Sequence, residues 1–443
     1  MKIEITLSLI SHTNVGKTTL ARTLLARDVG DVSDQPHVTD ESERFVFLEN
    51  EDGRLVLWDT PGFGAIKKGL LQRVRHDKGA WQWLLREVVD KLVNRSLYCS
   101  VEAARNVGKH ADVVIYLVDA RLSPQDSPYV QDELELLDAI GKPVIIALNQ
   151  TADQTKALQT WTSLMGTRSV IRDVLVLDSV RRSWHNESKL LKSLLPLLEP
   201  EKADVARQFL ALREQNTLDS VKQAADMIAD LLDFAADQRI DATDCSKREA
   251  VDRLSAQLLK ETERFTLEMA ALHHIDVEGN AVFRRQLEDV SGHFQLMDEK
   301  KTGFWSGAIT GASTGLIADA MAGGLSFGGG FVLGAVLGGL GGMSLAHVLN
   351  ATRKDEARWQ PAVIHELLLF ALQIYLVCAR HGRGGGTLKL DDRLISADDI
   401  QRAAQSIGAA VRIDASDHLS KAIYESIATW INASELDSKA ANP

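Results

Sequence analysis

The stretch SHTNVGKT, from Ser11 to Thr18, decides the fold of the N-terminal part of this chain. It follows a predicted strand, Lys2–Ile10, and opens a predicted helix, Lys17–Ala26. A strand, the pattern GxxxxGK[ST] and a helix, in this order, form a loop whose backbone N–H groups surround phosphate oxygens at the positive end of the helix. Here Ser11 replaces the first glycine. The stretch therefore predicts a phosphate-binding loop (P-loop) in an α/β fold.

A second motif, DTPG from Asp59 to Gly62, directly follows another apolar strand. An aspartate at a strand end can hold Mg²⁺ through water, and the Gly62 N–H can donate a hydrogen bond to a γ-phosphate. In the first motif, Gly16 lets the backbone approach the phosphates, Lys17 neutralises the β and γ oxygens, and the Thr18 hydroxyl ligates Mg²⁺. Together the two motifs predict a site for a nucleoside triphosphate with magnesium.

The pattern of apolar runs predicts the sheet that carries these motifs. Phe45–Leu48 and Arg54–Asp59 form a predicted hairpin. The runs Val113–Val118 and Val144–Leu148 are rich in β-branched residues and typical of buried parallel strands, and Val174–Leu177 is the expected last strand. Strands that alternate with helices predict a mostly parallel, doubly wound sheet with helices on both faces.

NVGKTTL followed by DTPGFG resembles the Era-like branch of the translation-factor-class (TRAFAC) GTPases, over roughly the first 180–200 residues. The resemblance implies GTP and GDP as ligands and a threonine between the motifs that closes over Mg²⁺ and the γ-phosphate. Thr39 occupies that place; the alternative interpretation is that Thr39 is an ordinary loop residue. The implied catalytic residues are Lys17, Thr39 and Gly62, and the implied metal ligands are Thr18, Thr39 and Asp59. The implied nucleotide-binding residues are Ser11, Asn14, Val15, Gly16, Lys17, Thr18, Thr19, Asn149 and Asp153.

The base-recognition motif departs from the family pattern NKxD. Asn149 is in place, but glutamine replaces the lysine at Gln150, and the aspartate, Asp153, is displaced by one residue. Asp153 either reaches the base through a bulged loop or caps the following helix. Guanine is therefore inferred from the family, and an ATPase on the same loop remains an alternative.

The residue after DTPG is Phe63, where Ras-type GTPases carry a water-orienting glutamine. A phenyl ring cannot polarise water, so backbone groups, another residue or a partner must position it. In several relatives the asparagine at the place of Asn14 helps to bind a monovalent cation, which suggests K⁺ here. The alternative is that Asn14 braces the loop through local hydrogen bonds.

Composition and length limit what the whole chain can be. The chain has 443 residues, of which 45% are hydrophobic and 25% charged, as in an ordinary globular protein of two or three domains. Its 50 basic and 61 acidic residues give a net charge of −11, so nucleic acid is not an expected partner. The N-terminus lacks signal-peptide character, and a cytoplasmic protein is expected. We place the P-loop domain at residues 1–200, with a helical insertion at about 65–111, and a mainly helical domain at residues 201–443.

A nearly uncharged, glycine-rich stretch spans residues 302–349, where only Asp319 and His347 are ionisable. Glycine recurs at every fourth residue from Gly303 to Gly315 and from Gly330 to Gly342. In a helix such spacing forms a smooth face that another helix can approach closely, which predicts a glycine-zipper hairpin. The hairpin either contacts the inner face of a membrane, as a peripheral or inserted element, or packs within the helical domain.

Three functions are compatible with this sequence. The first is a Mg²⁺-dependent GTPase that switches a helical, membrane-associating or effector-binding domain, with slow turnover when no partner assists. The second is a nucleotide-binding scaffold with negligible hydrolysis, because Ser11 and the NKxD motif depart from the pattern. The third is an ATPase.

Overall fold

The computed structural model describes residues 2–26, 42–63, 95–150, 154–179, 182–241, 247–275, 349–350, 356–381 and 421–427. The chain divides into two compact units. The first comprises Met1–Thr217 with His381–Gly385, and the second comprises Leu218–Arg380 with Gly386–Pro443. Most of the predicted insertion and the glycine-rich stretch fall at residues 64–94 and 276–348, outside the described residues.

The first unit contains a six-stranded sheet in the order β2-β3-β1-β4-β5-β6. Only the β2–β3 pair is antiparallel, and all other neighbours are parallel. The mostly parallel sheet predicted from the apolar runs is therefore confirmed. The strands are β1 (Ile3–Ser11), β2 (Glu43–Glu49), β3 (Gly53–Asp59), β4 (Val113–Asp119), β5 (Val144–Asn149) and β6 (Ile171–Val176).

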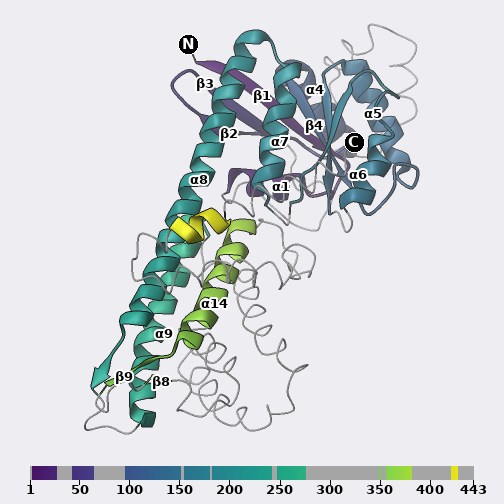
Figure 1. Cartoon of the computed structure of the whole chain (residues 1–443). Helices are drawn as coiled ribbons and strands as arrows, with labels where there is room; N and C mark the ends of the chain where they lie inside the picture. The colour runs from purple at the N-terminus through teal and green to yellow at the C-terminus, as the bar shows by residue number, and fades with distance from the viewer. Residues whose placement is uncertain are drawn as a thin grey trace. The chain divides into compact units, whose positions relative to one another are not determined.

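Helices cover both faces of this sheet, because the central strands are apolar on both sides (Figure 1). In β4, for example, Ile115 belongs to one buried cluster and Tyr116 to the other. The first cluster takes in α1 (Lys17–Leu25), α7 (Trp184–Leu194) and the start of α8 (Pro200–Asp237). The second takes in α4 (Arg95–His110), α5 (Pro128–Ile140) and α6 (Gln154–Thr162).

Parallel strands place their carboxyl ends at one edge of the sheet, which is where open α/β sheets bind ligands. In this unit the edge carries Ser11 at the end of β1, Asp59 at the end of β3 and Asn149 at the end of β5. The topology thus brings both predicted motifs and the predicted base-recognition segment to the same edge.

The described part of the second unit contains the rest of α8, α9 (Lys247–Leu272) and α14 (Pro361–Arg380). α9 packs against α14. A small antiparallel sheet in the order β7-β9-β8 (Ile240–Asp241, Glu356–Trp359 and Leu349–Asn350) was not predicted. It is reinforced where Trp359 Nε1 donates to Gln238 Oε1 at 2.6 Å. The mainly helical character predicted for this part of the chain is confirmed.

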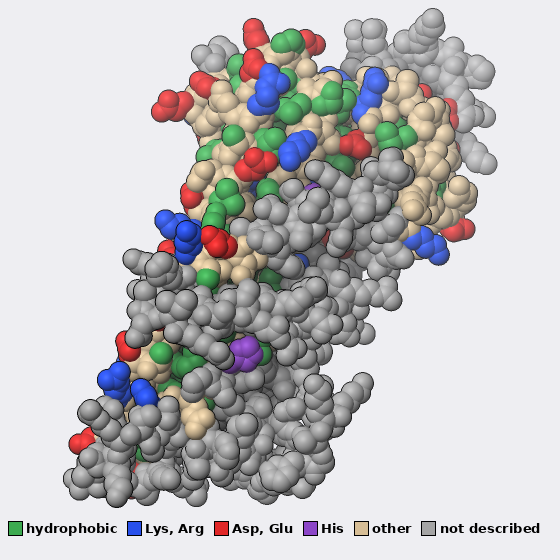
Figure 2. All heavy atoms as spheres, in the orientation of Figure 1, with side chains coloured by type: hydrophobic (Ala, Val, Ile, Leu, Met, Phe, Trp, Pro, Cys, Tyr) green, Lys and Arg blue, Asp and Glu red, His purple; other side chains and the backbone are tan. Residues whose placement is uncertain are grey.

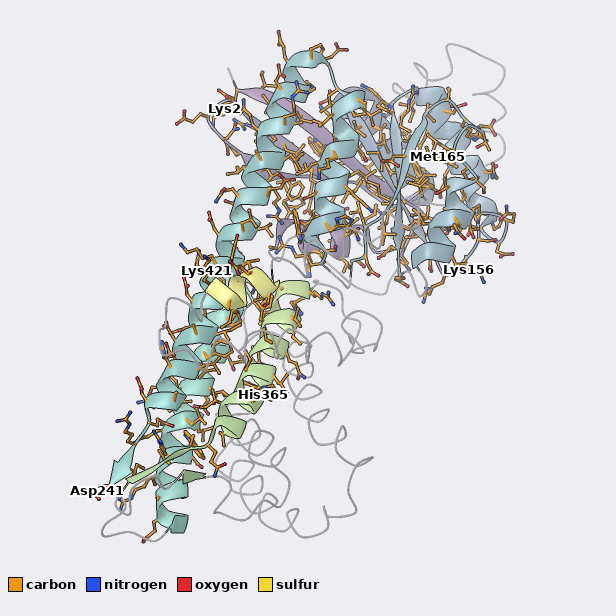
Figure 3. All side chains as sticks on the ribbon, viewed as in Figure 1. Lys2, Lys156, Met165, Asp241, His365 and Lys421 are labelled. Atoms are coloured by element: carbon orange, nitrogen blue, oxygen red, sulfur yellow. The ribbon has the colours of Figure 1, made fainter. Side chains whose placement is uncertain are left out.

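One helix in the described part of the chain is long and apolar enough to cross a membrane. This segment, Val363–Arg380 in α14, is 65% buried within the protein, and the core helix of a globular protein has the same properties. Figure 3 shows His365 on this helix and Asp241 at the end of β7.

The described surface of the first unit carries charges of both signs. On the face shown in Figure 2, Lys and Arg side chains lie among Asp and Glu side chains, without a continuous area of one sign among the described residues.

Candidate nucleotide-binding site

The P-loop joins β1 to α1, and its shape depends on Gly16. Gly16 has φ = 100°, in the left-handed region that favours glycine, and it caps α1 without a side-chain hydrogen bond. A Cβ atom at this position would lie 2.9 Å from Asn149 Nδ2. The N-terminal amides of α1 are thus presented at the sheet edge without a competing side-chain cap, as anion binding at a helix N-terminus requires.

Lys17 is buried, with 8% of its surface exposed, and its Nζ donates to Ser11 Oγ at 3.2 Å. Burial lowers the pKa of Lys17, while the negative charges of Asp59 and Glu133 oppose this shift. The Ser11 hydroxyl in turn donates to the His12 carbonyl oxygen. The serine that replaces the first glycine of the motif therefore contacts Lys17, the lysine of the same motif, directly.

Thr18 and Asp59 meet at the predicted metal position. Thr18 Oγ1 donates to Asp59 Oδ2 at 2.5 Å, although the two residues come from different motifs. Among the residues that the structure describes, the buried Asp59 Oδ1 has no hydrogen-bond partner. Burial raises the pKa of Asp59, and Lys17 and the Thr18 hydroxyl oppose this shift. A hydroxyl oxygen next to a carboxylate with a vacant oxygen suits a hard cation such as Mg²⁺.

The DTPG segment packs directly on the P-loop. A Cβ at Gly62 would lie 3.0 Å from Thr13 Cα and 3.2 Å from Lys17 Nζ, so only glycine fits without displacement. Phe63 N donates to Ser11 O at 2.8 Å, and Thr13 N donates to Phe63 O at 3.1 Å. The Phe63 side chain is fully buried in the core of the first unit, so it takes no part in orienting water.

The end of β5, where the sequence predicts base recognition, is tied to the P-loop through Asn149. Its Nδ2 donates to Val15 O at 2.7 Å, and its Oδ1 accepts from Ser179 N at 2.9 Å and Ser179 Oγ at 3.0 Å. Thr23 Oγ1 of α1 donates to Ser179 O at 2.7 Å. Asn149 thus links the P-loop, β5 and the loop after β6, while Gln150 follows with φ = 56°.

The structure brings Lys17, Thr18, Asp59 and Gly62 together around the P-loop, with Asn149 bracing it. Two predicted site residues, Thr39 and Asp153, lie outside the described residues. Sequence reasoning gave no role to three residues that contact the site, because neither motif specifies the residue type at their positions. They are His12, Glu133 and Ser179.

Comparison with known proteins agrees with this geometry. Residues 6–150 match the family described as 50S ribosome-binding GTPase. GTPase Era of Caldanaerobacter subterraneus subsp. tengcongensis is 28% identical over 145 residues, which cover 32% of this chain and 38% of the relative. GTPase Era of Clostridioides difficile is 21% identical over 196 residues, 43% of this chain and 55% of the relative. This chain thus spans about two fifths to about half of the length of these curated relatives.

Among solved structures, Aquifex aeolicus Era bound to GDP·AlF₄⁻ is 20% identical. The match covers 52% of this chain and 68% of that one with a TM-score of 0.33, a likeness too slight to bear on function.

The first unit is a P-loop domain of the Era-like GTPase class, a GTP-binding fold. A second family match covers residues 167–396, just over half of the chain, and is described as a domain of unknown function, DUF3482. The chain belongs to the DUF3482 family.

Proposed function

We propose that this protein hydrolyses GTP to GDP with Mg²⁺ and acts as a nucleotide switch for its helical second unit. The observation that carries the proposal is the meeting of Thr18 and the partly unpaired carboxylate of Asp59 beside the buried Lys17. When bound, Mg²⁺ would neutralise charge on the β and γ oxygens, with Thr18 and Asp59 as its protein ligands. Lys17 and the amides of α1 hold the phosphates, and the N–H of Gly62 contacts the γ-phosphate. We include Thr39 as the residue that closes over this site.

The proposed hydrolysis is slow without a partner, because the side chain after DTPG is a buried phenyl ring. Asn14 lies in the P-loop with φ = 63°, and in this proposal it would help to hold K⁺ when nucleotide is bound. A cation there would stabilise charge that develops in the transition state. Turnover should be faster in K⁺ than in Na⁺, and equal rates would remove K⁺ from the proposal.

The decisive experiment is binding of fluorescent GTP and ATP analogues to the wild type, Lys17→Ala and Lys192→Ala. Lys192 is a matched control, because its side chain is 53% exposed and ion-paired with Glu214 at 3.7 Å. Lys17→Ala should weaken GTP binding at least 100-fold, while Lys192→Ala should leave it within about twofold. No binding of either purine to the wild type would refute the proposal.

A second set of measurements tests the metal and the alternatives. Asp59→Asn should raise the Mg²⁺ concentration needed for GTP binding, because one charged ligand is lost. Tight GTP binding without phosphate release would favour the nucleotide-binding scaffold. Preference for ATP would favour the ATPase, an alternative that the glutamine at Gln150 keeps open.

We further propose a cytoplasmic location, with membrane contact or self-association through residues 302–349. The low charge and regular glycine spacing of that stretch support the proposal. Flotation of the full chain with liposomes, with and without GTP, tests it. If the protein stayed at the bottom of the gradient both with and without GTP, and sedimented as a monomer, membrane contact and self-association would both be excluded.

A further inference from the structure

A cluster of polar side chains lies at the start of the P-loop, and neither sequence motif assigns it a role. His12 Nδ1 contacts Glu133 Oε1 of α5 at 2.7 Å, and the Tyr116 hydroxyl of β4 donates to Glu133 Oε2 at 2.7 Å. The ring of His12 stacks on Tyr129, with 4.1 Å between centroids and an interplanar angle of 19°. Both carboxylate oxygens of Glu133 are therefore engaged, one of them by a side chain of the P-loop.

Glu133 is a costly residue to keep at this position. Its side chain is 1% exposed, whereas that of His12 is 29% exposed. Burial raises the pKa of Glu133, and the hydrogen bonds from His12 and Tyr116 oppose that shift. A buried carboxyl group costs free energy unless it is fully hydrogen-bonded, and an apolar residue would fill the space at lower cost. Burial energetics alone therefore do not favour a carboxylate at this position.

The contact falls where the P-loop leaves its strand. On either side of His12, Ser11 O accepts from Phe63 N and Thr13 N donates to Phe63 O. At the far end of the loop, Val15 O accepts from Asn149. The loop is thus held at both ends, with the positive φ of its middle residue between the two attachments. Since ordering each backbone residue costs about 1–2 kcal/mol of conformational entropy, attachment at both ends favours the curled conformation.

We propose that Glu133 is a positioning residue that acts through His12 to hold the P-loop in its phosphate-binding conformation. This inference rests on the proposed function, because the phosphates are those of the nucleotide. In this arrangement Glu133 contacts His12 and Tyr116. Its effect is on the free energy needed to order the loop, and so on nucleotide affinity.

Two substitutions of His12 separate its hydrogen bond from its ring. His12→Asn places an amide N–H close to the position of Nδ1 and keeps the donor to Glu133. His12→Phe keeps a ring against Tyr129 but has no donor, so one buried carboxylate oxygen loses its partner. A role confined to packing would favour the phenylalanine variant, whereas the positioning role favours the asparagine variant.

The test combines amide hydrogen exchange with nucleotide binding on the full chain. In nucleotide-free protein, amides of residues 12–16 should exchange at least tenfold faster in His12→Phe than in the wild type, and within threefold in His12→Asn. Affinity for a fluorescent GDP analogue should fall about tenfold in His12→Phe and less than threefold in His12→Asn. Thermal unfolding confirms that each variant is folded.

A second pair of variants keeps the test decisive if His12→Phe does not fold. Glu133→Gln retains an acceptor for His12 and a group that bonds to Tyr116, and should behave as the wild type, whereas Glu133→Met should behave as His12→Phe. Equal exchange and affinity in the two members of a pair would overturn the inference. If the wild type bound no nucleotide, the proposed function would fail, but the exchange rates of the loop would still decide whether the His12–Glu133 contact orders it.

Discussion

Replacing Gly16 by alanine should damage this protein much more than the same replacement at Gly141, although both glycines have a positive φ. Gly16 has φ = 100° and Gly141, at the end of α5, has φ = 78°. An alanine in this region costs about 1–2 kcal/mol at either position. At Gly141 no described atom lies within 4 Å of the added Cβ, so strain is the whole effect.

At Gly16 the added Cβ would lie 2.9 Å from Asn149 Nδ2, and Asn149 would have to move. That movement breaks its 2.7 Å bond to the Val15 carbonyl, and a buried polar group without a partner costs about 1–3 kcal/mol more. Gly16→Ala should therefore cost about 2–5 kcal/mol in total. At about 2–4 °C per kcal/mol for a domain of this size, its melting temperature should fall clearly below that of Gly141→Ala.

Thermal unfolding of the two variants and the wild type, followed by circular dichroism, measures this difference. Titration with a fluorescent GDP analogue should also show at least a 100-fold loss of affinity for Gly16→Ala and less than a twofold change for Gly141→Ala. If Gly16→Ala melted no lower than Gly141→Ala, the argument from the Asn149 contact would be refuted.

Two further predictions concern how α7 and α8 are held in place. The side chain of Glu187 is 3% exposed and accepts hydrogen bonds from Arg182 Nε at 2.9 Å and from Arg213 Nε at 3.0 Å. Burial raises the pKa of Glu187, but the two arginines outweigh burial and hold this pKa below the ordinary 4.5. Glu187→Gln should therefore lower the melting temperature at pH 7. This difference in melting temperature should shrink as the pH falls below about 4.5, because the wild-type carboxyl group is then protonated and loses its ion pairs. A constant difference across pH 3–7 would contradict this prediction. Phe209→Ala, at a fully buried position in α8, should cost about 3–5 kcal/mol in urea unfolding, whereas Phe234→Ala, at a position 37% exposed on the same helix, should cost less than about 1 kcal/mol. Equal costs would mean that the start of α8 does not pack on the sheet as described.

Most strands of the first unit were predictable, because buried parallel strands are apolar throughout. The fourth and fifth strands of the sheet differ from their predicted ranges by one residue. The start of β6 was missed because Arg172 and Asp173 interrupt its apolar run where the pairing with β5 is irregular. The small sheet of the second unit escaped prediction because two of its three strands, β7 and β8, have only two residues each, which is too short to show a period of two.

The sequence by itself determined the P-loop and the position of the aspartate at the end of β3. Both motifs follow apolar strands, and parallel strands end at the same sheet edge, so local pattern was sufficient to bring Thr18 and Asp59 together. Only the tertiary structure decided how that loop is held. His12 meets a glutamate 121 residues away, and Asn149 meets the carbonyl of a residue 134 positions earlier. No local sequence pattern indicates either contact, because each depends on how a helix or a neighbouring strand packs against the loop.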